Sequence, residues 1–195
     1  MTPGLESMLA RHEQGDETLQ LENADLRGMD LSGRALTHIV LYRSQLDGVS
    51  LRGADLYGSN LSGSSLVSAD LRGAQLSKAG LAGVRLQGAR LEAALANRTD
   101  FSEADLRGAD LRDANIGAAV LARADLRGAL LRGTQLDRVL FDRTRVHAAD
   151  LRGAAGLDGA RVVSIDVGET DPIRLEGDAA RAWLLDRISP GARPR

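Results

Sequence analysis

Leucine recurs at every fifth position through most of this chain. From Leu21 to Leu151 there are 27 such positions, here called centres, and 22 of them are Leu. The other five centres are Ala96, Phe101, Ile116, Phe141 and Val146. The residue two places before a centre is mostly small, and it is Ala in 14 of the 27 repeats. Apolar positions therefore come in pairs with a period of five, and a fixed period of this kind dictates the architecture.

The period excludes the two regular secondary structures. Five residues on an α-helix rotate the chain by roughly 140° net, so the centres would scatter around the helix and no single face could bury them. On a straight strand an odd step would send successive centres to opposite faces. The pattern fits a chain that is extended for about three residues and then turns a corner. Gly follows two residues after the centre in 13 repeats, where a corner requires freedom in φ. The sequence predicts a coil with stacked Leu inside, but the period alone does not give the number of corners per coil.

Five repeats read Ala-Asp-Leu-Arg-Gly, at 24–28, 69–73, 104–108, 124–128 and 149–153. This phrase resembles the A(D/N)LXX consensus of the pentapeptide-repeat family. The resemblance implies an all-β fold, a right-handed quadrilateral parallel β-helix with four repeats in each coil. The 27 repeats would then form nearly seven coils, a rod roughly 30 Å long at the spacing of parallel strands.

The chain divides into three predicted parts. Residues 1–17 form an N-terminal cap, a short helix with Leu5, Met8 and Leu9 on one face, because the exposed end of a solenoid requires a cover. A partner-binding arm is the alternative. Residues 18–167 form the β-helix. Residues 168–195 form a C-terminal helix and tail.

The repeat shifts by one residue at Gly156, after which Leu157 and Val162 resume the role of centres. Val163, Ile165 and Val167 then alternate with polar residues, which predicts a closing strand. A helix is predicted over 173–188. It caps the last coil, forms a dimer, or does both, and the residues expected at a dimer interface are Trp183, Leu184 and Ile188. Relatives that resemble this chain in size pair through such segments.

Two repeats depart from the pattern. Arg34 occupies a small inward position in the first coil, where its charge could reach the open end of the stack. Ala96 replaces a central Leu, which leaves room that Phe101 at the next centre could fill. The register is expected to survive this distortion.

The sequence offers little catalytic chemistry. It has no Cys, and its three His residues, His12, His38 and His147, lack the spacing of metal ligands. Asp stands immediately before the centre in nine repeats, but these side chains point outward beside Arg and are expected to form solvated ion pairs. We therefore expect no catalytic, cofactor or metal site and no enzyme. No run of about 18 apolar residues predicts a membrane helix, and no secretory signal is evident, so a cytoplasmic location is predicted.

The resemblance implies a function at the rod surface. Similar pentapeptide-repeat proteins confer quinolone resistance or self-protection by acting on DNA gyrase or topoisomerase IV, and an acidic rod that imitates DNA is the proposed basis. In this chain, outward Asp and Arg nearly cancel on each of the four faces. The sequence predicts neither a strongly acidic face nor a nucleic-acid binder.

Two surface features point to protein contact instead. Asp100 and Glu103 lie close together in one repeat, and Val120 and Leu140 occupy normally polar outward positions one coil apart. These four residues form the predicted partner surface. The expected function is binding to DNA gyrase or topoisomerase, to modulate it or protect it from inhibitors. The alternative is an interaction scaffold with an unrelated protein partner.

Overall fold

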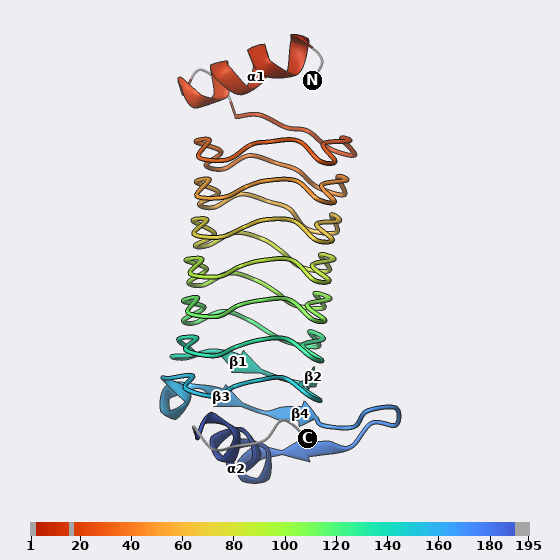
Figure 1. The fold of residues 1–195 in the computed structure, drawn as a ribbon, viewed down its shortest axis with the longest axis vertical. Helices are drawn as coiled ribbons and strands as arrows, with labels where there is room; N and C mark the ends of the chain where they lie inside the picture. Colours follow the sequence, from red (N-terminus) through yellow and green to blue (C-terminus); the bar gives the residue numbers. More distant parts are fainter. Residues whose placement is uncertain (1–2, 16–17, 190–195) are drawn as a thin grey trace.

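A computed structural model describes residues 3–15 and 18–189 of the chain. Coils of similar size stack into a rod, with helix α1 across one end and helix α2 across the other (Figure 1). The named elements are α1 (Pro3–Glu13), β1 (Leu140–Phe141), β2 (Thr144–Arg145), the 3-10 helix η1 (Leu157–Gly159), β3 (Arg161–Val162), β4 (Ser164–Asp166), β5 (Arg174–Glu176) and α2 (Gly177–Ile188).

Each coil takes 20 residues. The residues just before the centres form parallel bridges to the residues 20 positions later, from Gln20 with Val40 through to Gln135 with Ala155. The backbone N–H of Leu66, for example, donates to the carbonyl of Arg85 at 2.7 Å. Four repeats per coil are thereby confirmed. On each side, neighbouring coils are joined by a bridge of a single residue. Strands of two or three residues occur, within the described residues, only from Leu140 on.

Every corner of the stack is a tight turn with a left-handed residue. The N–H of Ala69 donates to the carbonyl of Leu66 at 3.1 Å, and Ser68 between them has φ of 57°, as in a type II turn. The equivalent residue has positive φ in all 27 repeats, 13 with Gly and 14 with another residue. The predicted need for a positive φ is confirmed, although about half of the corners have a residue other than Gly at this position.

The core is a column of Leu flanked by Ala. Where Ser or Thr replaces Ala, the hydroxyl donates to the carbonyl of a centre in the preceding coil, for example from Thr99 to Leu76 at 2.7 Å. Buried hydroxyls therefore keep a partner. Ala96 and Phe101 are both fully buried, and Leu95 keeps its bridges to Gln75 and Asn115. The register survives at this repeat, as predicted.

Helix α1 lies over the first coil (Figure 1). Leu9 is 1% exposed and belongs to the core. The Arg34 guanidinium leaves the core and pairs with Glu6 at 2.6 Å and Glu13 at 3.3 Å, both on α1. The escape of Arg34 toward the open end is confirmed, and its two ion pairs join the helix to the rod. Residues 1–2 and 16–17 of the predicted cap lie outside the described part of the chain.

The one-residue shift at Gly156 is confirmed. Gly156 has φ of 80°, and β1 pairs with β3 so that Leu140 faces Arg161, a step of 21 residues in place of 20. Strand β2 pairs with β4 at the same step, and β4 pairs on its other side with β5, antiparallel. The C-terminal segment is therefore joined to the rod by strand pairing.

One prediction for the C-terminal end is wrong in part. The helix does not begin at 173, because Arg174–Glu176 form β5 on the edge of β4, with Leu175 opposite Ile165. An unpaired strand edge is a template for pairing, and it overrides the helical pattern of these residues.

The predicted closing strand is present as β4, but burial does not follow the alternation of apolar and polar residues. Ile165 is buried, and so are Ser164 and Asp166, whereas Val163 is 43% exposed. Hydrogen bonds explain why the two polar side chains are buried. The Ser164 hydroxyl accepts from the N–H of Arg143 at 2.9 Å, and the Asp166 carboxylate accepts from the N–H groups of Gly168 and Ile173 at 3.0 and 2.9 Å.

Candidate interaction groove

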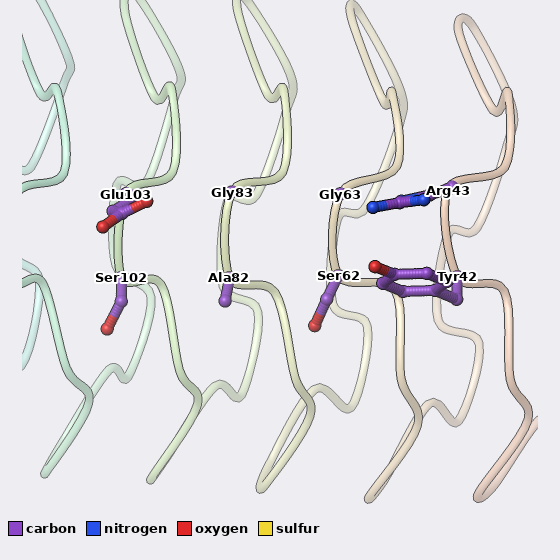
Figure 2. Close-up of a pocket in the computed structure, with 8 residues that line it drawn as sticks. All are labelled: Tyr42, Arg43, Ser62, Gly63, Ala82, Gly83, Ser102 and Glu103. Carbon is purple, nitrogen blue, oxygen red and sulfur yellow. The ribbon is translucent and has the colours of Figure 1, made fainter.

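One corner of the rod is hollowed into a shallow groove of about 580 Å³. Figure 2 shows its lining, two turn residues from each of four successive coils. These residues are Tyr42, Arg43, Ser62, Gly63, Ala82, Gly83, Ser102 and Glu103. The two middle coils carry only small side chains at this corner, so the long side chains of the outer coils form the ends. At the spacing of parallel strands the groove spans about 14 Å along the rod.

The two ends of the groove carry opposite charge. Arg43 extends along the rod axis toward Gly63 beside the ring of Tyr42 (Figure 2), and its guanidinium carbon lies 4.9 Å from the ring centroid. Glu103 at the other end pairs with Arg123 at 3.1 Å, and both side chains are more than half exposed. Because such an exposed pair is weak, Glu103 remains available to another cation.

The predicted partner surface lies at the Glu103 end of the groove. Asp100, Val120 and Leu140 follow one another along one bridge ladder, and the structure thus brings the apolar pair next to the acidic residues. Asp100 is exposed, and its carboxylate accepts only from the N–H of Ser102, at 2.9 Å. Val120 and Leu140 are half-buried.

Six of the nine repeat Asp residues are paired with an Arg two positions later in the same repeat. Asp25 and Arg27 flank an inward Leu, so both point outward, and the Arg27 side chain donates to both carboxylate oxygens at 2.8 and 2.6 Å. The same arrangement recurs in the repeats of Asp70, Asp105, Asp110, Asp125 and Asp150. The predicted Asp–Arg networks are confirmed. Besides the pairs within a repeat, Arg132 and Arg145 pair with Asp150 and Asp125 across neighbouring coils.

These ion pairs shift the titration of the carboxylates. Hydrogen bonds from Arg27 lower the pKa of Asp25 to about 2. Those from Arg72 and Arg112 lower the pKa of Asp70 and Asp110. At Asp105, burial raises the pKa but the hydrogen bonds from Arg107 outweigh it, and the pKa is lowered. These four carboxylates therefore stay ionised at neutral pH beside their Arg partners.

The residues predicted at a dimer interface lie on α2. Leu184 is fully buried against the rod. Trp183 is half-buried, with the Arg187 guanidinium 3.5 Å from its ring centroid. Ile188 is also half-buried, and its carbonyl accepts from the N–H of Gly153 in the last regular coil, at 2.8 Å. Helix α2 therefore covers the end of the stack, with parts of Trp183 and Ile188 still at the surface.

The groove itself was not predicted. Its signal in the sequence is the succession of small residues at 62–63 and 82–83 between larger ones at 42–43 and 102–103. That succession appears only when residues 20 positions apart are compared, which is the coil length that the resemblance implies.

Other kinds of site find little support in the described ranges, 3–15 and 18–189. They contain no group of three or more His, Asp or Glu side chains that could hold a metal ion. In the same residues, neither α1 nor α2 is long and apolar enough to cross a membrane.

The chain belongs to the pentapeptide-repeat family. The family model, described as pentapeptide repeats, matches in eight copies over residues 20–58, 44–83, 85–121 and 119–154, which is more than half of the chain. Membership implies a right-handed β-helix, in agreement with the 20-residue coils. No curated protein sequence matches the chain.

Several solved structures are similar to this one. The pentapeptide-repeat protein HetL of the cyanobacterium Nostoc, involved in regulating heterocyst differentiation, is 25% identical, with 89% of this chain and 100% of that chain covered and a TM-score of 0.39. QnrB1, a plasmid-mediated fluoroquinolone resistance protein, is 16% identical, with 87% and 99% covered and a TM-score of 0.45. A thylakoid-lumen pentapeptide-repeat protein of Arabidopsis thaliana is 22% identical, with 85% and 90% covered and a TM-score of 0.26. The family assignment rests on the repeat sequence and not on these structures.

Proposed function

We propose that this protein is a non-enzymatic, cytoplasmic binding rod whose partner is a topoisomerase, DNA gyrase, which it modulates or protects from inhibitors. Such a role would serve antibiotic resistance or self-immunity. The choice of partner class comes from the resemblance of the repeats to topoisomerase-protecting relatives. The rod would bind the enzyme in the manner of a DNA mimic, through carboxylates that stand in for phosphates.

The observation that carries the proposal is the uncompensated acid at Asp100. Its repeat has Ser102 where the ion-paired repeats have Arg, so the carboxylate has a backbone N–H as its partner in place of a guanidinium. Glu103 adds a second exposed acid in the same repeat. A small acidic patch of this kind can attract a basic surface, although the neutral columns around it limit mimicry to a short stretch of the rod.

A supercoiling assay with purified gyrase tests this proposal. The protein is titrated with and without a gyrase poison, and we expect inhibition of supercoiling, or rescue from the poison, near stoichiometric protein. The double variant Asp100→Asn/Glu103→Gln should weaken the effect about tenfold or more, since two exposed charges are lost at the contact. Asp30→Asn is the matched control, because Asp30 is also followed two residues later by Ser, on another face. No effect of the folded protein in either arm would exclude gyrase as the partner.

A second candidate is an interaction scaffold for an unrelated protein. The half-buried column of Val120 and Leu140, one coil apart, favours it, since an apolar contact needs no basic partner. The two candidates differ in salt dependence. Binding through Asp100 and Glu103 should weaken between low and physiological salt, whereas binding through the apolar column should persist and be lost in Leu140→Ser.

We further propose that the C-terminal segment forms a homodimer through Trp183 and Ile188. Parts of both side chains reach the surface at the end of the rod. Leu184, fully buried, would support the helix rather than touch the partner copy. Trp183→Ala should then remove this C-terminal contact, seen in sedimentation at high salt as a smaller particle, while its circular dichroism stays unchanged. An unchanged dimer would exclude this interface.

A further inference from the structure

Charges alternate along the corner that contains the groove. Going down the rod one coil at a time, the turns at 22–23, 42–43, 62–63, 82–83, 102–103 and 122–123 carry negative, positive, no, no, negative and positive charge. The charged residues are Glu22, Arg43, Glu103 and Arg123, and all four are exposed. When the order of the turns is reversed, every charged position has the opposite sign to the one it has in the forward order.

Because the signs of these charges invert when their order is reversed, the corner is complementary to the same corner of a second, antiparallel copy. When two copies of the rod lie side by side and antiparallel, the uncharged turns face each other at the middle. Arg43 of one copy then faces Glu103 of the other, and Glu22 faces Arg123. A two-fold axis produces each contact twice, as in an isologous dimer. We propose that this corner is a self-association surface that binds a second copy of the chain, antiparallel and centred between the coils of Gly63 and Gly83.

The shape of the corner supports close approach at that centre. The two middle coils present only Ser62, Gly63, Ala82 and Gly83 (Figure 2). Arg43 already lies along the axis over the coil of Gly63, with its Cγ 3.4 Å from where a Cβ on that glycine would stand. Its guanidinium is thus held inside the groove, on the side from which the partner's Glu103 would approach, and it forms no ion pair with any described residue of its own chain.

In two of the other three corners, the equivalent antiparallel arrangement brings like charges together, Arg27 with Arg127 in one and Lys78 with Arg98 in the other. In the remaining corner only Arg72 and Glu92 would form an opposite-charge pair. Like charges opposite each other disfavour association, and the groove corner is the one in which every charged turn faces an opposite charge.

The inference is separate from the proposed partner, but it shares a residue with it. Glu103 belongs both to this corner and to the acidic patch, so pairing of two rods would cover it. A laterally paired rod is therefore expected to compete with any partner that binds the patch.

Sedimentation velocity of the full chain over a range of concentrations tests the proposal. We expect a lateral dimer that weakens with added salt. Arg43→Glu and Glu103→Arg should each weaken it about tenfold or more, because each places two pairs of like charges in the interface. The double variant Arg43→Glu/Glu103→Arg should restore much of the dimer, since the exchanged charges again face opposite partners.

Arg98→Glu is the matched control, because Arg98 occupies the same turn position on another corner, also with positive φ. It should leave association unchanged. Thermal unfolding of each variant verifies that the rod is intact. Three outcomes would overturn the inference: a monomer at all concentrations, single variants without effect, or a charge exchange that fails to rescue. A dimer lost only in Trp183→Ala would assign self-association to the C-terminal segment instead.

Discussion

The regular stack and the C-terminal end of the rod hold their backbones in place by different means. In the stack, the backbone amide of each centre from Leu21 to Leu136 donates to a carbonyl of the next coil, and the same bond recurs every five residues. Beyond Gly156 the step lengthens to 21 residues, and particular side chains take over. Asp166 holds the β4–β5 loop through two N–H groups, and Arg181 donates to the carbonyl of Asp158 at 2.7 Å.

This difference determines how each region responds to mutation. Neighbouring coils in a stack support one another, and stability is roughly a sum of units and their interfaces. A substitution on the stack surface therefore leaves the ladder intact. At the C-terminal end a single polar side chain can decide whether a loop is ordered.

The largest effect is expected from the core of the stack. Leu66 is fully buried, and Leu66→Ala should lower the free energy of unfolding by about 2–5 kcal/mol through lost burial and the cavity left behind. Urea denaturation measures it. Leu95→Ala, at a surface position 39% exposed, is the control and should cost less than about 1 kcal/mol. Equal losses at both positions would contradict the assigned core.

A smaller and more local effect is expected at Asp166. Asp166→Ala leaves the N–H groups of Gly168 and Ile173 without their acceptor, at a cost of about 1–3 kcal/mol. The loss should appear as faster hydrogen exchange at these two amides, with the amides of the stack unchanged. Asp171→Ala, an exposed acid in the same loop, serves as control. Unchanged exchange at Gly168 and Ile173 would show that the loop does not depend on Asp166.

Two neighbouring turns offer a pair of substitutions with opposite sign. Gly73 and Ala93 occupy the same corner in successive coils, with φ of 64° and 55°. An Ala in the left-handed region lowers the free energy of unfolding by about 1–2 kcal/mol. Replacing Gly by Ala also reduces the conformational entropy of the unfolded chain, which offsets about 0.4–1 kcal/mol of this loss. Gly73→Ala should thus destabilise by roughly 0.5–1 kcal/mol and Ala93→Gly should stabilise by a similar amount. Denaturation midpoints that move in the same direction would refute the turn assignment.

The smallest effect per residue is expected from the repeat ion pairs. The pKa of Asp25 falls from 3.8 to about 2 in the folded chain because of Arg27, so its contribution to stability is fully present above pH 3.8 and is lost as the pH falls through about 2. Arg27→Gln should slightly lower the melting temperature near neutral pH. The difference from the unaltered protein should vanish on acidification to about pH 2. A difference independent of pH would mean that Arg27 acts through packing alone.

The sequence was sufficient for the repeating part of the fold because Leu, Ala and Gly at fixed spacing leave few backbones that bury every centre. It was insufficient where contacts with other parts of the fold decided the local structure. Arg174 to Glu176 carry a helical pattern, yet they form a strand because β4 offers an edge. Burial along β4 does not follow the alternation of apolar and polar residues, because hydrogen bonds keep Ser164 and Asp166 buried beside Ile165. The groove depends on how large and small side chains pack at one corner over four coils, and the conformation of long side chains such as Arg43 does not follow from the repeat pattern.

The coil length also bears on how the chain folds. Every ladder contact joins residues 20 or 21 positions apart, so the typical contact spans about a tenth of the chain, a value in the range of fast-folding helical bundles rather than most β proteins. No contact in the ladder has to wait for a distant segment. A coil can dock as soon as about 20 further residues emerge from the ribosome, and the rod can grow from α1 toward α2 during synthesis.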